Sequence, residues 1–142
     1  QQYIGDAGLI LEFKASGQIA NSPLPTPEKF SFGGADYGKG FANSHIFGDS
    51  GWSSSIKLTK NTYSKNDISI SPFIWFDYGA TDDLTGEKRE SSASTYGFGV
   101  GGNFNRDTSY QISLGVPGTD ESNPSKTGLD HAILKFNIGL QF

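Results

Sequence analysis

The fold of this chain is decided by the stretch LKFNIGLQF at residues 134–142, where large apolar residues alternate with small or polar ones. Successive side chains of a β-strand point to opposite faces of the sheet. The stretch therefore predicts a strand with one apolar face and one polar face. The apolar row consists of Leu134, Phe136, Ile138, Leu140 and Phe142.

The same period of two recurs in five further segments. The longest of them spans residues 68–79, with Ile74 and Phe76 on its apolar side and Asp77 on its other side. The remaining segments span residues 9–14, 52–59, 95–104 and 110–116. We interpret all six segments as strands that each cross a bilayer, for which about 9–11 residues are needed.

The composition agrees with a single all-β domain over residues 1–142. Glycine occupies 19 positions and aromatic residues make up 13% of the chain, while only 35% of it is hydrophobic. This composition is typical of twisted strands and turns and not of a helical bundle. The net charge of −4 provides no basic surface for nucleic acid. The lack of cysteine excludes a disulfide framework, a thiolate metal site and a cysteine nucleophile.

Alternation of this kind fits two environments. In a soluble β-sandwich the apolar face packs on a second sheet, whereas in a transmembrane β-barrel it meets lipid and the polar face lines the interior. A polar face rich in Gly and Ser favours an antiparallel transmembrane β-barrel. Connections also alternate between a short turn at 105–108 and long polar loops at 80–93 and 117–130. Aromatic residues near strand ends, as in a membrane-interface girdle, are Tyr63, Tyr78, Tyr96 and Tyr110.

The number of strands stays open at this point. An open sheet of six strands leaves two unpaired edges, which lipid does not tolerate. We therefore expect either the C-terminal six strands of a larger barrel or a small closed barrel of eight strands, with an extra hairpin within residues 28–47. A small barrel without transport activity and a soluble β-sandwich that acts as a binding module remain the alternatives.

Residues 17–50 separate the first two predicted strands and are too long for an ordinary hairpin loop, which predicts a functional segment. Three motifs follow one another from this loop onward. They are the loop-tip motif Gly38-Lys39-Gly40-Phe41, the turn motif Gly48-Asp49-Ser50-Gly51 and the wall motif Trp75-Phe76-Asp77-Tyr78-Gly79. In this order and spacing, and with the terminal Phe142, the chain resembles the C-terminal part of two-partner secretion transporters. These are outer-membrane barrels of the haemolysin secretion type, related to the outer-membrane assembly factors.

The resemblance implies an outer-membrane pore of a Gram-negative bacterium that exports a large unfolded exoprotein of the haemolysin or adhesin type. A relative that inserts barrels into the membrane is the alternative within the superfamily. The resemblance also implies that the long loop folds into the barrel. Its tip residue, Lys39 where the family has arginine, would then pair with Asp77 on the inner wall. Because lysine lacks the planar fork of arginine, we expect a looser anchor.

The last strand is implied to carry an assembly signal for the barrel-assembly machinery. Its residues are Phe136, Ile138, Leu140 and Phe142. The lipid bilayer, the secreted exoprotein and this machinery are the expected partners.

No motif supports catalysis or a cofactor. Gly48-Asp49-Ser50-Gly51 resembles the nucleophile loop of a protease, but Trp52 follows where that loop has glycine. The spacing of Gly97, Gly99 and Gly102 matches a dinucleotide-binding pattern, yet no helix pattern follows it. The two histidines, at positions 45 and 131, have no neighbouring ligand residues in the sequence. We therefore expect neither an enzyme nor a metal site.

Overall fold

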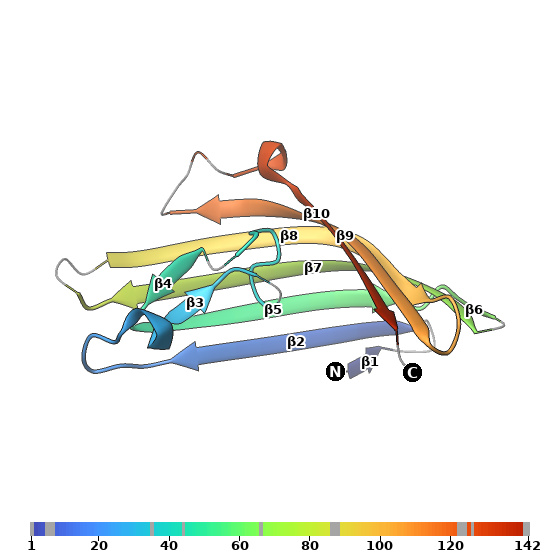
Figure 1. The fold of residues 1–142 in the computed structure, drawn as a ribbon, viewed down its shortest axis with the longest axis horizontal. Helices are drawn as coiled ribbons and strands as arrows, with labels where there is room; N and C mark the ends of the chain where they lie inside the picture. Colours follow the sequence, from blue (N-terminus) through green and yellow to red (C-terminus); the bar gives the residue numbers. More distant parts are fainter. Residues whose placement is uncertain are drawn as a thin grey trace.

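The computed structural model describes residues 2–4, 8–34, 36–43, 45–65, 67–85, 89–121, 125 and 127–140. These residues form one curved antiparallel sheet of eight strands and a separate sheet of two strands (Figure 1). The predicted all-β antiparallel class is confirmed. In the described part of the chain the large sheet is open, with β1 and β10 at its edges. No helix among these residues is long and apolar enough to span a membrane.

Strands of the large sheet pair in the order β1-β2-β5-β7-β8-β9-β10, and β6 pairs with β7. The strands are β1 (Gln2–Ile4), β2 (Leu9–Gln18), β5 (Ser50–Lys60), β6 (Tyr63–Lys65), β7 (Ile68–Asp83), β8 (Arg89–Asn103), β9 (Thr108–Asp120) and β10 (Ile133–Leu140). Both β5 and β6 pair with β7 along the same edge, because Thr59 lies opposite Phe73 and Tyr63 opposite Ile70. The 3₁₀ turn η3 (Leu129–His131) precedes β10.

The six predicted strands correspond to β2, β5, β7, β8, β9 and β10, but β2, β7, β8 and β9 reach clearly further than predicted. The hairpin of β7 and β8 continues from the pair Ala80–Ser92 to the pair Asp83–Arg89. The predicted long loop at 80–93 is therefore wrong, since most of it is strand. Backbone pairing continues there without apolar alternation, because hydrogen bonds of a ladder require no particular side chain. The predicted loop at 117–130 likewise begins as strand, since β9 extends to Asp120.

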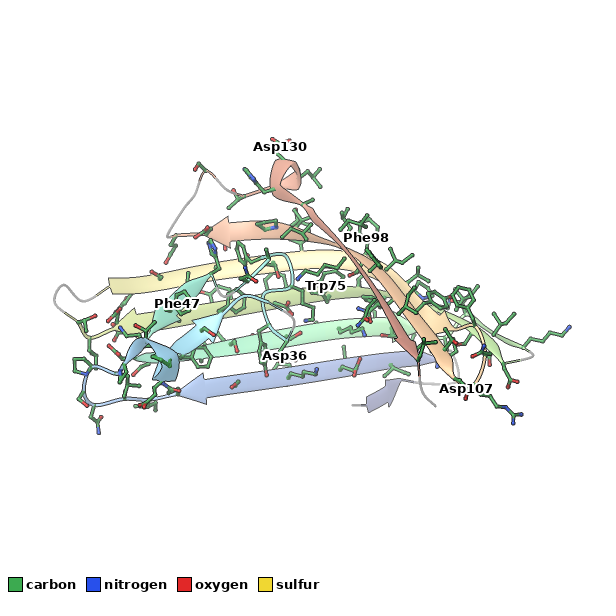
Figure 2. All side chains as sticks on the ribbon, viewed as in Figure 1. Asp36, Phe47, Trp75, Phe98, Asp107 and Asp130 are labelled. Carbon is green, nitrogen blue, oxygen red and sulfur yellow. The ribbon has the colours of Figure 1, made fainter. Side chains whose placement is uncertain are left out.

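The apolar face of the large sheet is exposed. Phe136 is 78% exposed, Phe98 59% and Ile74 58%. Figure 2 labels Phe98 on β8 and Trp75 on β7; Trp75 lies opposite Gly97, the neighbour of Phe98, and is buried on the other face of the sheet. In a β-sandwich the exposed side chains would be buried against a second sheet, so the described residues contradict that alternative. Val116 is an exception to its predicted row, because it is buried. It precedes Pro117, whose backbone oxygen accepts a hydrogen bond from Gly128 N (2.8 Å) where the chain before η3 returns to β9.

The polar face of the sheet is covered by the chain between β2 and β5. This segment contains the 3₁₀ turn η1 (Thr26–Glu28) and the strands β3 (Phe30–Phe32) and β4 (Ile46–Gly48). The expected hairpin within residues 28–47 therefore exists, but it forms its own two-stranded sheet and adds no strand to the large one. It packs over β5, β7 and β8 (Figure 1). A small core lies between hairpin and wall, formed by Phe32, Phe41, Ile46 and Ala93.

Candidate functional site at the inner wall and loop tip

The tip of the long loop binds the wall at Asp77, which is fully buried on the inner face of β7. Lys39 Nζ lies 2.9 Å from Asp77 Oδ1 and 3.1 Å from Oδ2, and the backbone N–H of Lys39 donates to Oδ2 (3.0 Å). Thr95 of β8 donates to the same Oδ2 (3.4 Å). A buried carboxylate is stable only when it is paired and hydrogen-bonded. Lys39 of the loop therefore supplies most of the hydrogen bonds that Asp77 accepts.

The ammonium group of Lys39, at the tip of the loop, also contacts a second strand of the wall. Besides the carboxylate, Lys39 Nζ donates to Ser55 Oγ of β5 (3.2 Å). An ammonium has three donors around one atom, whereas arginine would present a planar fork to the carboxylate. Lys39 thus contacts two neighbouring strands at once. That the Lys39–Asp77 pair anchors the loop less tightly than an arginine–aspartate pair would stays a prediction.

The glycines of the loop-tip motif allow the close approach of the tip to the wall. Gly38 has a φ of +72°, a conformation that glycine adopts readily. A Cβ at Gly40 would lie 2.8 Å from Thr95 Cβ, and Gly115 of β9 faces the same point of the tip. Phe41 is buried against Phe32 in an edge-to-face contact (6.3 Å, 73°). The motif therefore places one charged and one aromatic side chain against the wall.

Three residues of the wall motif share one face of β7. Trp75, Asp77 and Gly79 are all buried there, with Trp75 in a tilted contact with Phe73 (5.8 Å). Gly79 lies against Phe32 of β3. Asp77 and Gly79 therefore contact the loop directly, at Lys39 and at Phe32.

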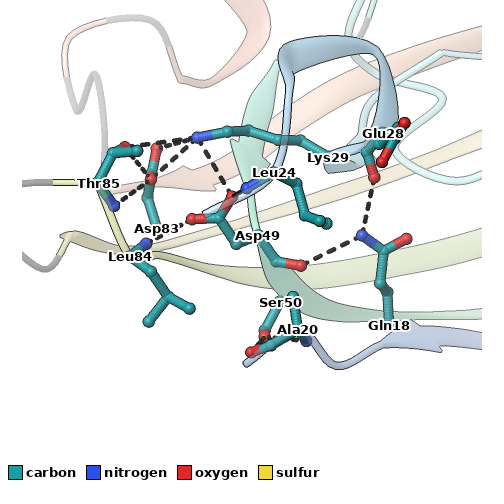
Figure 3. A network of polar contacts seen from close by, with 10 residues as sticks. All are labelled: Gln18, Ala20, Leu24, Glu28, Lys29, Asp49, Ser50, Asp83, Leu84 and Thr85. Atoms are coloured by element: carbon teal, nitrogen blue, oxygen red, sulfur yellow. Dashed lines mark hydrogen bonds and ion pairs between the residues drawn. The ribbon is translucent and has the colours of Figure 1, made fainter. Parts of the chain in front are cut away.

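The turn motif attaches the two ends of the loop to the rim of the sheet. Asp49 is fully buried and accepts hydrogen bonds from Leu24 N (2.7 Å) and Leu84 N (2.6 Å), as Figure 3 shows. Lys29 binds Asp83 at 2.9 Å and lies 3.5 Å from Asp49. Hydrogen bonding to Asp83, with the nearby charge of Asp49, raises the pKa of Lys29 although burial opposes the shift. The flanking Gly48 and Gly51 lie in β4 and β5.

Two further contacts of the loop were missed by sequence reasoning. His45 Nε2 lies 2.5 Å from Asp120 Oδ2 at the end of β9, and the imidazole stacks on Phe41 (4.0 Å, 5°). Lys135 of β10 donates to the backbone oxygens of Phe41 (3.2 Å) and Gly34 (3.4 Å). These partners lie far apart in the chain, so no local motif signals them. The loop is thus bound to every long strand from β5 to β10.

The remaining predicted site residues lie away from the loop. Phe136 (78% exposed), Ile138 (63%) and Leu140 (63%) form the exposed row of β10, and Phe142 lies outside the described residues. Within the described part of the chain, no group of three or more His, Asp or Glu side chains is arranged to hold a metal ion.

Comparison with known proteins matches the chain to a protein family. A family model described as "Haemolysin secretion/activation protein ShlB/FhaC/HecB" matches residues 2–104, which is more than half of the chain. The match runs from β1 through β8 and includes the whole loop and Asp77. No curated protein and no solved structure was found to match.

Proposed function

Since the chain belongs to the haemolysin secretion/activation protein family, we propose that it forms part of the wall of an outer-membrane pore that exports a large unfolded exoprotein. The family implies a transporter of two-partner secretion. We propose that residues 1–142 are one barrel domain or the C-terminal segment of a larger barrel. In either case the edges at β1 and β10 need pairing partners in the membrane, because an open sheet edge is not stable in lipid.

The two faces of the sheet suit this role. An exposed apolar face of six long strands is compatible with contact to lipid tails, and a polar inner face with a water-filled passage. We propose that the C-terminal row of Phe136, Ile138, Leu140 and Phe142 is read by the barrel-assembly machinery.

The observation that carries the proposal is the buried ion pair between Lys39 and Asp77. It holds the loop tip against the inner wall, in the space through which a polypeptide would pass. Transport then requires the loop to shift or the polypeptide to pass beside it. We propose that Gly38, Lys39, Gly40 and Phe41 act as the movable part, with Trp75, Asp77 and Gly79 as its seat. Gly48, Asp49 and Gly51 would act as the fixed hinge at the rim.

Deletion of the gene in its host tests export directly. One large polypeptide should disappear from the culture supernatant, as measured by mass spectrometry, and should return when the gene is restored. The level of other outer-membrane barrels serves as the second readout. A general fall of those barrels with an unchanged supernatant would favour barrel assembly, and no change in either would contradict both functions.

A further inference from the structure

Lys135 is an inner-face lysine whose ammonium group has no acidic partner among the residues that the structure describes. Lys135 lies on β10, opposite Ser113 of β9, and its hydrogen bonds go to the neutral backbone oxygens of Phe41 and Gly34. Among the described residues, no carboxylate lies within 4.0 Å of it, whereas Lys39 and Lys29 each bind an aspartate. Lys135 therefore lies next to the loop tip without a carboxylate in direct contact.

A charge of this kind is costly in a strand that crosses a membrane. Ionisable residues within membrane-spanning segments are rare, face the interior and generally mark the path of a substrate or ion. Lys135 follows that rule, because it lies between Leu134 and Phe136, which are exposed on the opposite face. Its contacts with two carbonyl oxygens, at 3.2 and 3.4 Å, are long for a charged donor. The ammonium is therefore available to a better acceptor.

Lys135 borders an open hollow of about 500 Å³ between the loop tip and the last two strands. The polar residues that line it are Lys39, Gln111, Ser113, Lys135 and Asn137, and none of its lining residues is acidic. Gln111 lies opposite Asn137 in the ladder, as Ser113 lies opposite Lys135. The hollow thus combines one unpaired ammonium with amide and hydroxyl groups, which is the chemistry that binds a carboxylate.

We propose that this hollow binds acidic side chains of the exported polypeptide, with Lys135 as the carboxylate-binding residue. The inference rests on the proposed export function. Side chains on one face of an extended polypeptide repeat at about 6.6–6.8 Å, which is also the spacing from Lys135 to Asn137 along β10. A cargo carboxylate binds an ammonium more strongly than a neutral carbonyl does. Its arrival therefore draws Lys135 away from Phe41 and Gly34 and frees the loop tip from β10, while Lys39 stays on Asp77.

The test uses the full-length gene product reconstituted in planar lipid bilayers. The probes are a Gly/Ser-rich peptide that carries glutamates and a matched peptide with glutamine at the same positions. For the wild type we expect the glutamate peptide to block half of the current at a roughly tenfold lower concentration than the glutamine peptide. Lys135→Gln should remove this preference, and Lys135→Arg should keep it.

Lys14→Gln is the matched control. Lys14 lies on the inner face of β2, opposite Ser55, and it does not line the hollow. The same loss of charge at this position should leave the tenfold preference in place. Pores of normal conductance in each variant show that the variant folds.

The outcomes separate the inference from the proposed function. Equal block by both peptides in a conducting wild type, or a preference that survives Lys135→Gln, overturns the carboxylate site and leaves export standing. Absence of any conductance from the wild type overturns the pore, and the carboxylate site with it.

Discussion

His45 Nε2 of the loop lies 2.5 Å from Asp120 Oδ2 at the end of β9, and the side chain of Asp120 is fully buried. The imidazole also stacks on Phe41, the aromatic residue of the loop tip. Lys39 pairs with Asp77 on a different strand, β7. One ion pair and one hydrogen-bond contact therefore hold the same short segment of loop to two strands, and the loop can leave the wall only if both are broken.

Replacement of His45 by alanine should loosen the loop without unfolding the sheet. The change removes a hydrogen bond to a buried carboxylate and the stacking partner of Phe41, with an expected cost of about 1–3 kcal/mol. Hydrogen exchange of residues 36–43 should become faster, while exchange in β7 and β8 stays unchanged. His131→Ala is the control, because His131 is exposed in η3. Equal protection of the loop in both variants would contradict a structural role of His45.

The Lys39–Asp77 pair should show energetic coupling. Lys39→Ala and Asp77→Ala each remove the ion pair, so the double variant should be less destabilised than the sum of the two by about 0.5–3 kcal/mol. Asp77→Ala should cost more, since Asp77 also accepts from Lys39 N and Thr95. Hydrogen exchange of the loop and export of the exoprotein are the two readouts.

The pair Glu12–Lys57 provides a control for that cycle. It joins neighbouring strands of the same sheet at 3.8 Å, and both side chains are partly exposed. Such pairs contribute about 0–1 kcal/mol, so the destabilisation of the double variant should equal the sum of the two single variants. Additive effects at Lys39 and Asp77 as well would refute the anchor.

Period-two alternation was sufficient to predict the sheet, because burial on one face constrains every second residue. It placed Asp77 on the inner face and Phe136 on the outer one, as the structure has them. Alternation does not reveal where a strand ends. The pairs from Ala80–Ser92 to Asp83–Arg89 consist largely of polar residues, so they read as a loop in the sequence.

Long-range contacts of the loop were harder to predict. The contact between Lys39 and Asp77 was predicted from the family resemblance of the motifs. Nothing in the residue pattern itself indicates that these two residues meet. His45 and Asp120 are 75 positions apart and belong to no motif. Their contact depends on how the β3–β4 hairpin rests on the wall, which follows from tertiary packing of Phe32, Phe41 and Ile46.

Asp49→Asn should loosen the attachment of the loop to the rim. Asp49 accepts two backbone N–H groups with different oxygens, from Leu24 and Leu84, and an amide offers only one oxygen. One buried donor then loses its partner, at a cost of about 1–3 kcal/mol. Limited proteolysis within residues 19–29 should become faster than in the wild type. Asp83→Asn, which affects a partly exposed ion pair with Lys29, should change the rate much less.

If the apolar face contacts lipid, the cost of placing an arginine on it should depend on how deep in the membrane that residue lies. Ile74 is 58% exposed near the middle of β7, and an arginine there should destabilise folding into lipid vesicles by about 2–4 kcal/mol. Ile68 is the first residue of the same strand and is also exposed, so Ile68→Arg should cost only about 0–1 kcal/mol at the membrane interface. Both changes add the same charge to the same face, so unfolding titrations in vesicles compare depth alone. Equal costs would mean that water or protein, and not hydrocarbon, covers this face, and the pore would lose its physical basis.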